Sequence, residues 1–125
     1  MKINKMFVYG TLQRGYYNER FLPDYMISKI WDATLNGDLY MVKHASFPAV
    51  VNVNSGNTVY GELYEIKEEY IENAIESCDY LEGHPILYKR TLVDVKDAHG
   101  ETHKAYAYIF CQLNKLGVRF DDGLF

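Results

Sequence analysis

The residue of this sequence best suited to acid–base chemistry is Glu82. It is expected at the carboxyl-terminal end of a helix, where unpaired carbonyl groups carry partial negative charge. That charge disfavours an ionised carboxylate by about 0.3–1 kcal/mol, and partial burial raises the pKa of an acid further. A carboxyl group tuned toward neutrality can both accept and donate a proton near pH 7. The open alternative is a solvated glutamate without a role, since surface glutamates are common.

A second candidate is the run Tyr9, Gly10, Thr11 and Leu12, which follows a short apolar stretch. Glycine permits a turn at which other residues clash, so the backbone N–H groups of Thr11 and Leu12 can point at one spot. Such a group of amides binds a carboxylate or a developing oxyanion. The alternative interpretation is an ordinary glycine between a strand and a loop, because one glycine is a weaker signal than a phosphate-binding loop.

The other nucleophiles and possible metal ligands carry little signal. Cys111 with His103 or His84 as its base matches no local signature of a cysteine enzyme. His99 and His103 are four residues apart, but they span a turn that leads into a predicted strand, which argues against zinc. The sequence therefore predicts no metal site and no cofactor.

The elements that must position these residues begin with a strand over residues 5–9 and a short helix around residues 18–22 that Pro23 ends. One or two strands are expected between residues 27 and 53, interrupted at Asn36-Gly37 and at Pro48, and a further strand is expected over residues 58–66. Residues 67–82 form the clearest helix, which Gly83 and Pro85 end. Its apolar stripe consists of Tyr70, Ile71, Ala74, Ile75, Cys78 and Leu81.

Two long strand-like runs follow, over residues 86–95 and 103–110, with a turn at residues 97–100. Residues 119–125 are expected to form a tail or a cap over the sheet. Because residues 105–110 are apolar on both faces, the sheet must be covered on both sides, which favours a closed or half-closed barrel. The fold class predicted is α+β with about six strands and one good helix.

Length and composition set the broad class. The 125 residues suit one domain over residues 1–125 that buries a core without metal or disulfide staples. The net charge of −4, without a basic cluster, argues against nucleic acid as a partner. No apolar run is long enough for a signal peptide or for the roughly 20 residues of a membrane span, so a cytoplasmic protein is expected. Cys78 and Cys111 are interpreted as buried thiols of a reducing compartment, although one disulfide stays open.

Three segments resemble a known family. FVYGTLQRG (residues 7–15) is similar to the opening signature of the γ-glutamylcyclotransferase-like proteins, which include the γ-glutamylamine cyclotransferases. VYGELYEI (residues 59–66) resembles the mid-chain strand of that family. CDYLEGHPILYKRT (residues 78–91) resembles its segment around the catalytic glutamate. Together, in this order and spacing, they cover residues 6 to about 110.

The resemblance implies a small mixed β-barrel with flanking helices that closes a γ-glutamyl amide to 5-oxoproline and releases an amine or amino acid. It implies Glu82 as the catalytic acid and base. It implies a substrate site that includes Tyr9, Gly10, Thr11, Leu12 and Tyr88, with the Phe47-Pro48 region beside it. His84 stands where relatives often have a small or thiol residue. The resemblance implies that His84 and the tail after Phe110 border the side of the site where the leaving amine sits.

Two alternatives to this activity stay open at the level of sequence. The same loop and cavity could belong to a non-catalytic module that binds an amino acid or small amide. The same chemistry could also act on a γ-glutamyl-capped biosynthetic intermediate. The sequence predicts a small-molecule partner and neither a nucleic acid nor a membrane. It leaves open the identity of the amine and the oligomeric state, for which a homodimer is one option.

Overall fold

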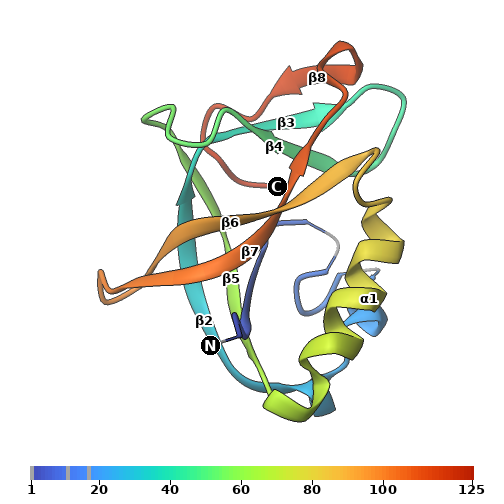
Figure 1. The fold of residues 1–125 in the computed structure, drawn as a ribbon. Coiled ribbons are helices and arrows are strands. Elements are labelled where there is room, and N and C mark those ends of the chain that lie inside the picture. Colours follow the sequence, from blue (N-terminus) through green and yellow to red (C-terminus); the bar gives the residue numbers. More distant parts are fainter. Residues whose placement is uncertain (1, 11, 17) are drawn as a thin grey trace.

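A computed structural model describes residues 2–10, 12–16 and 18–125 of the chain (Figure 1). One α-helix and eight strands are found within these residues. The strands are β1 (Lys5–Val8), β2 (Ile27–Asn36), β3 (Asp38–Val42), β4 (Pro48–Val51), β5 (Thr58–Ile66), β6 (Tyr88–Asp97), β7 (Thr102–Phe110) and β8 (Leu116–Arg119). The helix is α1 (Ile71–Glu82), and four 3-10 helices are Glu19–Phe21, Asp24–Met26, Glu68–Tyr70 and Leu113–Lys115.

Five strands close into a barrel in the order β1, β5, β2, β6 and β7. The neighbours along this order pair antiparallel. The barrel closes through a parallel contact between β1 and β7, at Met6 opposite Tyr106. Closure covers both faces of β7, whose residues Ala105, Ala107, Tyr108 and Phe110 are all buried. The predicted α+β class and barrel are confirmed.

A second group of strands extends the sheet beyond β7 in the order β4, β3 and β8. The prediction of one or two strands between residues 27 and 53 was too low, because β2, β3 and β4 all lie there. Pro48 begins β4 instead of interrupting a strand, and a first position is one that proline tolerates in a sheet. The tail also contributes a strand, β8, which pairs with β3. Short strands of four residues leave too little alternation to be recognised in the sequence.

Helix α1 begins later than the predicted start, because Glu68–Tyr70 forms a 3-10 turn. Its buried residues Ile71, Ala74 and Cys78 lie on the predicted apolar stripe. Gly83 ends the helix in the left-handed conformation with φ of 63°, and its N–H donates to the carbonyls of Asp79 and Tyr80. The helix therefore ends at Glu82, as the sequence predicts.

The short helix predicted around residues 18–22 is present and is of the 3-10 type. The chain there makes two single 3-10 turns, Glu19–Phe21 and Asp24–Met26, on either side of Pro23. Too few residues separate the preceding loop from the proline for an α-helical turn to propagate. The first of these turns docks on α1, where the Ser77 hydroxyl donates to the Phe21 carbonyl at 2.8 Å.

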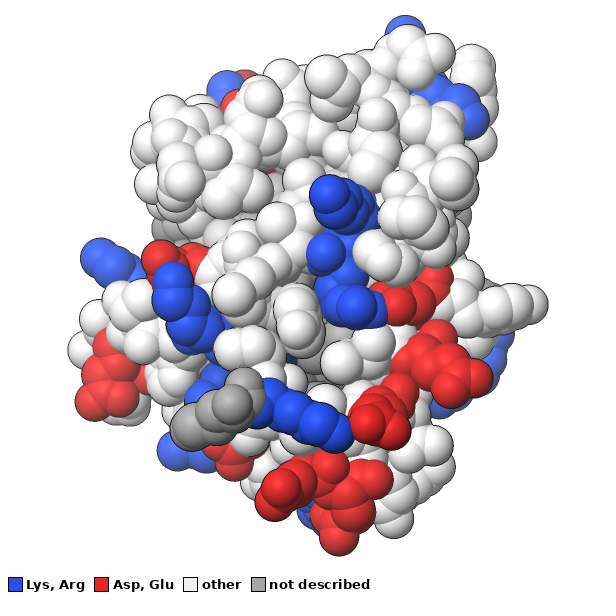
Figure 2. Space-filling model, in the orientation of Figure 1, with Lys and Arg blue, Asp and Glu red and all other residues white. Residues whose placement is uncertain are grey.

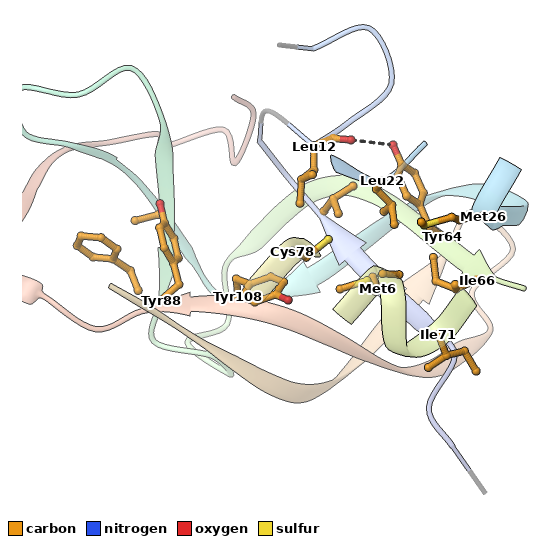
Figure 3. Close-up of a cluster of buried hydrophobic side chains, with 14 of the residues drawn as sticks. Met6, Leu12, Leu22, Met26, Tyr64, Ile66, Ile71, Cys78, Tyr88 and Tyr108 are labelled. Carbon is orange, nitrogen blue, oxygen red and sulfur yellow. Dashed lines mark hydrogen bonds between the residues drawn. The ribbon is translucent and has the colours of Figure 1, made fainter. Parts of the chain in front are cut away.

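The core consists of two groups of buried side chains. One fills the space between α1 and the barrel and includes Met6, Leu22, Tyr64 and Cys78 (Figure 3). The other fills the barrel interior and includes Phe7, Leu35, Leu63 and Val95. The group under α1 ends at Tyr88 and Tyr108, so the helix is packed against the same strands that carry these two rings.

The surface in the orientation of Figure 1 carries charges of both signs (Figure 2). Acidic side chains gather toward the side on which α1 lies, and basic side chains form a band nearer the middle. Cys78 and Cys111 are free thiols. Cys78 is buried as predicted, but Cys111 is exposed, because it follows the last residue of β7. Within the described part of the chain, no helix is both long and apolar enough to cross a membrane.

Candidate active site

A cavity of about 280 Å³ opens between the carboxyl end of α1, the loop after β1, the start of β4 and the strands β6 and β7. The described residues that line it are mostly apolar or aromatic, with one carboxylate. They are Phe7, Val8, Tyr9, Gly10, Leu12, Asn18, Phe47, Pro48, Leu81, Glu82, Leu87, Tyr88 and Tyr108. An apolar cavity with a few polar groups is the usual form of a small-molecule site.

Glu82 is the acid of this cavity, and it is the last residue of α1. Burial raises the pKa of its carboxyl group to about 7. The described residues donate no hydrogen bond to this carboxylate that would offset the cost of burying its charge. The group can therefore gain and lose a proton near neutral pH, as a general base and acid must.

Tyrosine rings form much of the wall around Glu82. The Tyr9 hydroxyl donates to the backbone carbonyl of Tyr108 at 2.5 Å, and the Tyr88 hydroxyl donates to the carbonyl of Pro48 at 2.6 Å. Burial raises the pKa of both hydroxyl groups, and the charge of Glu82 adds to this rise. These hydroxyls therefore stay neutral and tie the cavity wall together across strands.

The loop after β1 lines the same cavity as Glu82. A Cβ atom at Gly10 would lie 3.0 Å from Cγ and 3.1 Å from Cδ of Pro48, closer than an ordinary contact. Glycine thus lets the loop backbone approach the start of β4. The amides of Gly10 and Leu12 meet no acceptor among the described residues, which leaves both N–H groups available to a ligand.

Arg14 fixes the continuation of this loop. Its guanidinium donates to the Tyr64 hydroxyl at 3.2 Å, to the Leu22 carbonyl at 2.5 Å and to Asp24 at 2.9 Å. Its backbone N–H lies 2.9 Å from the Tyr64 hydroxyl and 3.0 Å from a Glu62 carboxylate oxygen. Figure 3 shows the Tyr64 hydroxyl directed at the carbonyl of Leu12, 3.5 Å away. Contacts to β5 and to both 3-10 turns therefore position the loop.

Comparison with known proteins identifies the family of this fold and site. A family of proteins described as gamma-glutamyl cyclotransferase, AIG2-like, matches residues 6–123. The chain belongs to this family.

Two relatives and one solved structure illustrate the membership. A Methanocaldococcus jannaschii protein, provisionally named as a gamma-glutamylcyclotransferase, is 30% identical over 84% of this chain and 82% of its own length. The gamma-glutamylaminecyclotransferase A of Danio rerio is 32% identical over 82% of this chain, which spans 66% of that protein. The crystal structure of an AIG2-like protein from Mus musculus has a TM-score of 0.67 at 22% identity, covering 94% of this chain and 86% of that one. This likeness shows that the two share the fold.

Among the residues expected in the site of a γ-glutamylcyclotransferase-like protein, Glu82, Tyr9, Gly10, Leu12 and Tyr88 all line the one cavity. Thr11 lies outside the described residues. Phe47 and Pro48 line the cavity as well, as the resemblance to the γ-glutamylcyclotransferases implies.

His84 and the tail do not meet the expectation that they border the site. The described lining does not include His84, whose Nδ1 accepts the backbone N–H of Arg90 at 2.9 Å. The tail folds back on the loop region beyond the cavity, where the Phe125 ring lies 5.8 Å from that of Tyr16. The described lining of the cavity instead includes Phe47, Leu81 and Leu87.

Sequence reasoning missed Tyr108, Asp79 and Arg14. Tyr108 lies in an apolar run in which the sequence pattern does not distinguish the residues that face the cavity from the others. No local signal therefore identifies Tyr108. Asp79 lies three residues before Glu82, on the same side of the helix, and this spacing could have drawn attention to it.

Two other features lie apart from the cavity of Glu82. Asp97, Glu101 and His103 have ligand atoms within 4.8 Å of one another at the turn between β6 and β7. The Asp97 carboxylate is already engaged there by His103 at 2.8 Å and by the amides of His99 and Glu101. These hydrogen bonds, that of His103 above all, lower the pKa of Asp97, so its carboxylate stays ionised near pH 7.

The second feature is a cavity of about 490 Å³ between β2, β5 and the tail, with Asp32, Tyr60, Asp97 and Phe125 among its lining residues. Asp97 is held as a permanent anion and cannot shuttle a proton at neutral pH. The cavity of Glu82, whose acid is raised toward neutrality, is therefore the better candidate for catalysis.

Proposed function

We propose that this chain cyclises a γ-glutamyl amide to 5-oxoproline and releases an amine or amino acid, with Glu82 as the general base and acid. Membership of the family supports γ-glutamylcyclotransferase activity in general terms. The observation that carries the finer proposal is the position of Glu82, whose carboxyl group has a pKa of about 7 and shares a small cavity with the loop after β1.

In the proposed reaction the α-amino nitrogen of the substrate attacks its own γ-carbonyl carbon. A C–N bond forms, the carbonyl electron pair moves to oxygen, and a five-membered tetrahedral intermediate results. The pair then returns as the bond to the leaving nitrogen breaks. Because the nucleophile is already tethered to the carbonyl, much of the entropic barrier is removed before the enzyme acts.

Glu82 would carry protons in both steps. It takes one proton from the α-ammonium group, whose reference pKa is about 7.7–8.0, and hands it to the departing nitrogen, which leaves as the amine. The ring nitrogen then still holds one proton more than the lactam, and the ionised Glu82 takes that proton and releases it to water or to the freed amine. An ordinary glutamate with a pKa of about 4.3 would face a cost of roughly 5 kcal/mol for the first transfer. With a pKa of about 7, Glu82 reduces that cost to about 1 kcal/mol.

The loop amides would hold the negative charge of the substrate. None of the described residues that line the cavity is Lys, Arg or His, so the substrate carboxylate or the oxyanion must rely on neutral donors. The N–H groups of Gly10 and Leu12 are available, and the sequence adds Thr11 between them. Loss of one oxyanion donor typically costs about 3–4 kcal/mol.

The test is 5-oxoproline release from a panel of γ-glutamyl amines, dipeptides and larger γ-glutamyl-capped amides, followed by mass spectrometry. Glu82→Gln should keep the fold and bind substrate but lose at least about a thousandfold in kcat. Glu76→Gln is the matched control, because Glu76 lies on the exposed face of the same helix. It should turn over like the wild type.

Two results would overturn the proposal. Near wild-type release by Glu82→Gln would remove Glu82 from the chemistry. Binding of these compounds by the wild type without conversion of any would favour the non-catalytic binding module.

A further inference from the structure

Tyr108 is the residue at which the two halves of the cavity are joined. Its hydroxyl donates to Oδ1 of Asp79 at 2.7 Å, and Asp79 lies one helical turn before Glu82 on α1. Its backbone carbonyl accepts the Tyr9 hydroxyl at 2.5 Å, and Tyr9 directly precedes Gly10. One residue of β7 is therefore bonded to the helix end that carries the acid and to the loop that carries the amides.

Asp79 is held from a second side. Its other carboxylate oxygen, Oδ2, forms an ion pair with Arg90 of β6, and the Arg90 guanidinium lies 5.1 Å from the centre of the Tyr106 ring. Both partners of this pair are about one quarter exposed, at 23% and 24% of the side chain, so water screens the pair only in part. The last turn of α1 is thus fixed to β6 and β7 at the level of the cavity.

We propose that Tyr108 and Asp79 are positioning residues, which set the distance and orientation of the Glu82 carboxyl relative to the loop amides. Neither takes a proton from the substrate. The Tyr108 ring lines the cavity, while its hydroxyl faces Asp79, and burial raises the pKa of that hydroxyl far above the working range. Since both proton transfers need hydrogen-bond reach to one small substrate, a shift of about 1 Å in the helix end is expected to cost up to about a hundredfold in rate.

A change in the position of the Glu82 carboxyl is expected to change its pKa, because the groups around it are neutral. Among the described residues, the titratable groups that interact with its carboxyl are Tyr9 in the loop after β1, Cys78 on α1 and Tyr88 on β6. All three are neutral at pH 7, and Arg90 is neutralised by Asp79. The pKa of Glu82 then depends mainly on how closely the carboxyl is enclosed, so a loosened helix end should lower it toward the ordinary value.

The first experiment compares Tyr108→Phe with Tyr80→Phe. Tyr108→Phe keeps the ring and the backbone carbonyl and removes only the bond to Asp79, whereas Tyr80 is 82% exposed beside Asp79 on α1. Tyr108→Phe is expected to lower kcat by about tenfold or more with a smaller rise in KM. A kcat within about twofold of the Tyr80→Phe control would overturn the inference.

A double-mutant cycle with Asp79→Ala tests whether the two residues act as one unit. In the Asp79→Ala background, Tyr108→Phe should change kcat by less than about twofold, because the bond between them is already lost. Independent effects that multiply in the double variant would contradict the inference. Thermal unfolding of each variant shows whether the protein is folded, and Tyr108→Phe alone decides the matter if Asp79→Ala does not fold.

This inference rests on the proposed function wherever it is tested through kcat. A second experiment therefore measures the titration of Glu82 without substrate. The Glu82 carboxyl is titrated by ¹³C NMR in the wild type and in Tyr108→Phe, with Glu82→Gln to assign its signal. If the wild type releases no 5-oxoproline, the proposed function fails, and this titration alone judges the positioning. A midpoint lowered by about one pH unit in Tyr108→Phe supports the inference, and an unchanged midpoint overturns it.

Discussion

Glu82 owes its chemical character to where its side chain lies, because the cavity encloses the carboxyl and none of the described residues donates a hydrogen bond to it. Burial raises its pKa from 4.5 to about 7 in the folded protein. An unfolded chain exposes the same group to water and restores its ordinary pKa. The folded state therefore holds an extra proton between about pH 4.5 and pH 7, and folding stability must depend on pH in that window.

The sign of this dependence gives a prediction that needs no substrate. Because the folded state binds more protons than the unfolded state, the free energy of unfolding falls as pH rises from 4.5 to 7, by about 3 kcal/mol in total. The glutamine of Glu82→Gln does not titrate, so this fall in the free energy of unfolding is absent in the variant. Its unfolding free energy should equal or fall below that of the wild type at pH 4.5 and exceed it at pH 8. Urea denaturation at both values measures the difference, and parallel pH curves for the two proteins would contradict the assigned pKa.

The raised pKa could be anticipated from the sequence only in part. Gly83 marks the helix end, so the sequence alone could place Glu82 beside unpaired carbonyls. The dominant cause is burial, and burial depends on Tyr9, Tyr88 and Tyr108, which come from three separate strand regions. No local pattern indicates which of the many tyrosines surround an acid.

At the scale of elements, the site depends on two short segments that other parts of the fold must hold in place. One is the last turn of α1, and the other is the loop after β1. The loop is tied down by Arg14, which contacts Tyr64 on β5 and the 3-10 turns that follow the loop. The Arg14 side chain is 20% exposed, so its hydrogen bonds are sheltered from water on most sides.

Arg14→Met is predicted to loosen the loop while leaving the acid in place. The KM for a γ-glutamyl amide should rise by about tenfold or more, with a smaller change in kcat, because the loop amides proposed to bind the substrate are no longer fixed. The free energy of unfolding should fall by about 1–3 kcal/mol, since buried acceptors lose a charged donor. Lys96→Met on the exposed face of β6 is the control. A KM equal to that of the control would remove Arg14 from the support of the site.

The sequence predicts elements best where periodicity is long. Helix α1 and the strands β5, β6 and β7 each run for nine residues or more and lie close to the predicted ranges. The sequence predicts a short helix after the loop, and this segment forms a pair of 3-10 turns, because Pro23 limits it. Its role is to supply carbonyls and a carboxylate to Arg14, and propensity carries no information about that role.

At the scale of the whole molecule, closure of the barrel brings the parts of the site together. β1 pairs with both β5 and β7, so the loop after β1 emerges next to Tyr108 although Tyr9 and Tyr108 are 99 residues apart in the chain. Helix α1 connects β5 to β6 and packs over the same end. The barrel could be predicted because β7 is apolar on both faces. The order of its strands could not, since it depends on long-range pairings that leave no local signature.

The central claim is that one enclosed carboxyl at the helix end performs the proton transfers of γ-glutamyl cyclisation. Its most direct test compares the pH dependence of kcat/KM for 5-oxoproline release with the ¹³C titration of Glu82 in the same wild-type protein without substrate. Both should show a midpoint near pH 7, with activity lost as the carboxyl becomes protonated. A carboxyl that titrates near its ordinary value of 4.5, or a rate that does not change between about pH 5 and pH 8, would contradict the account.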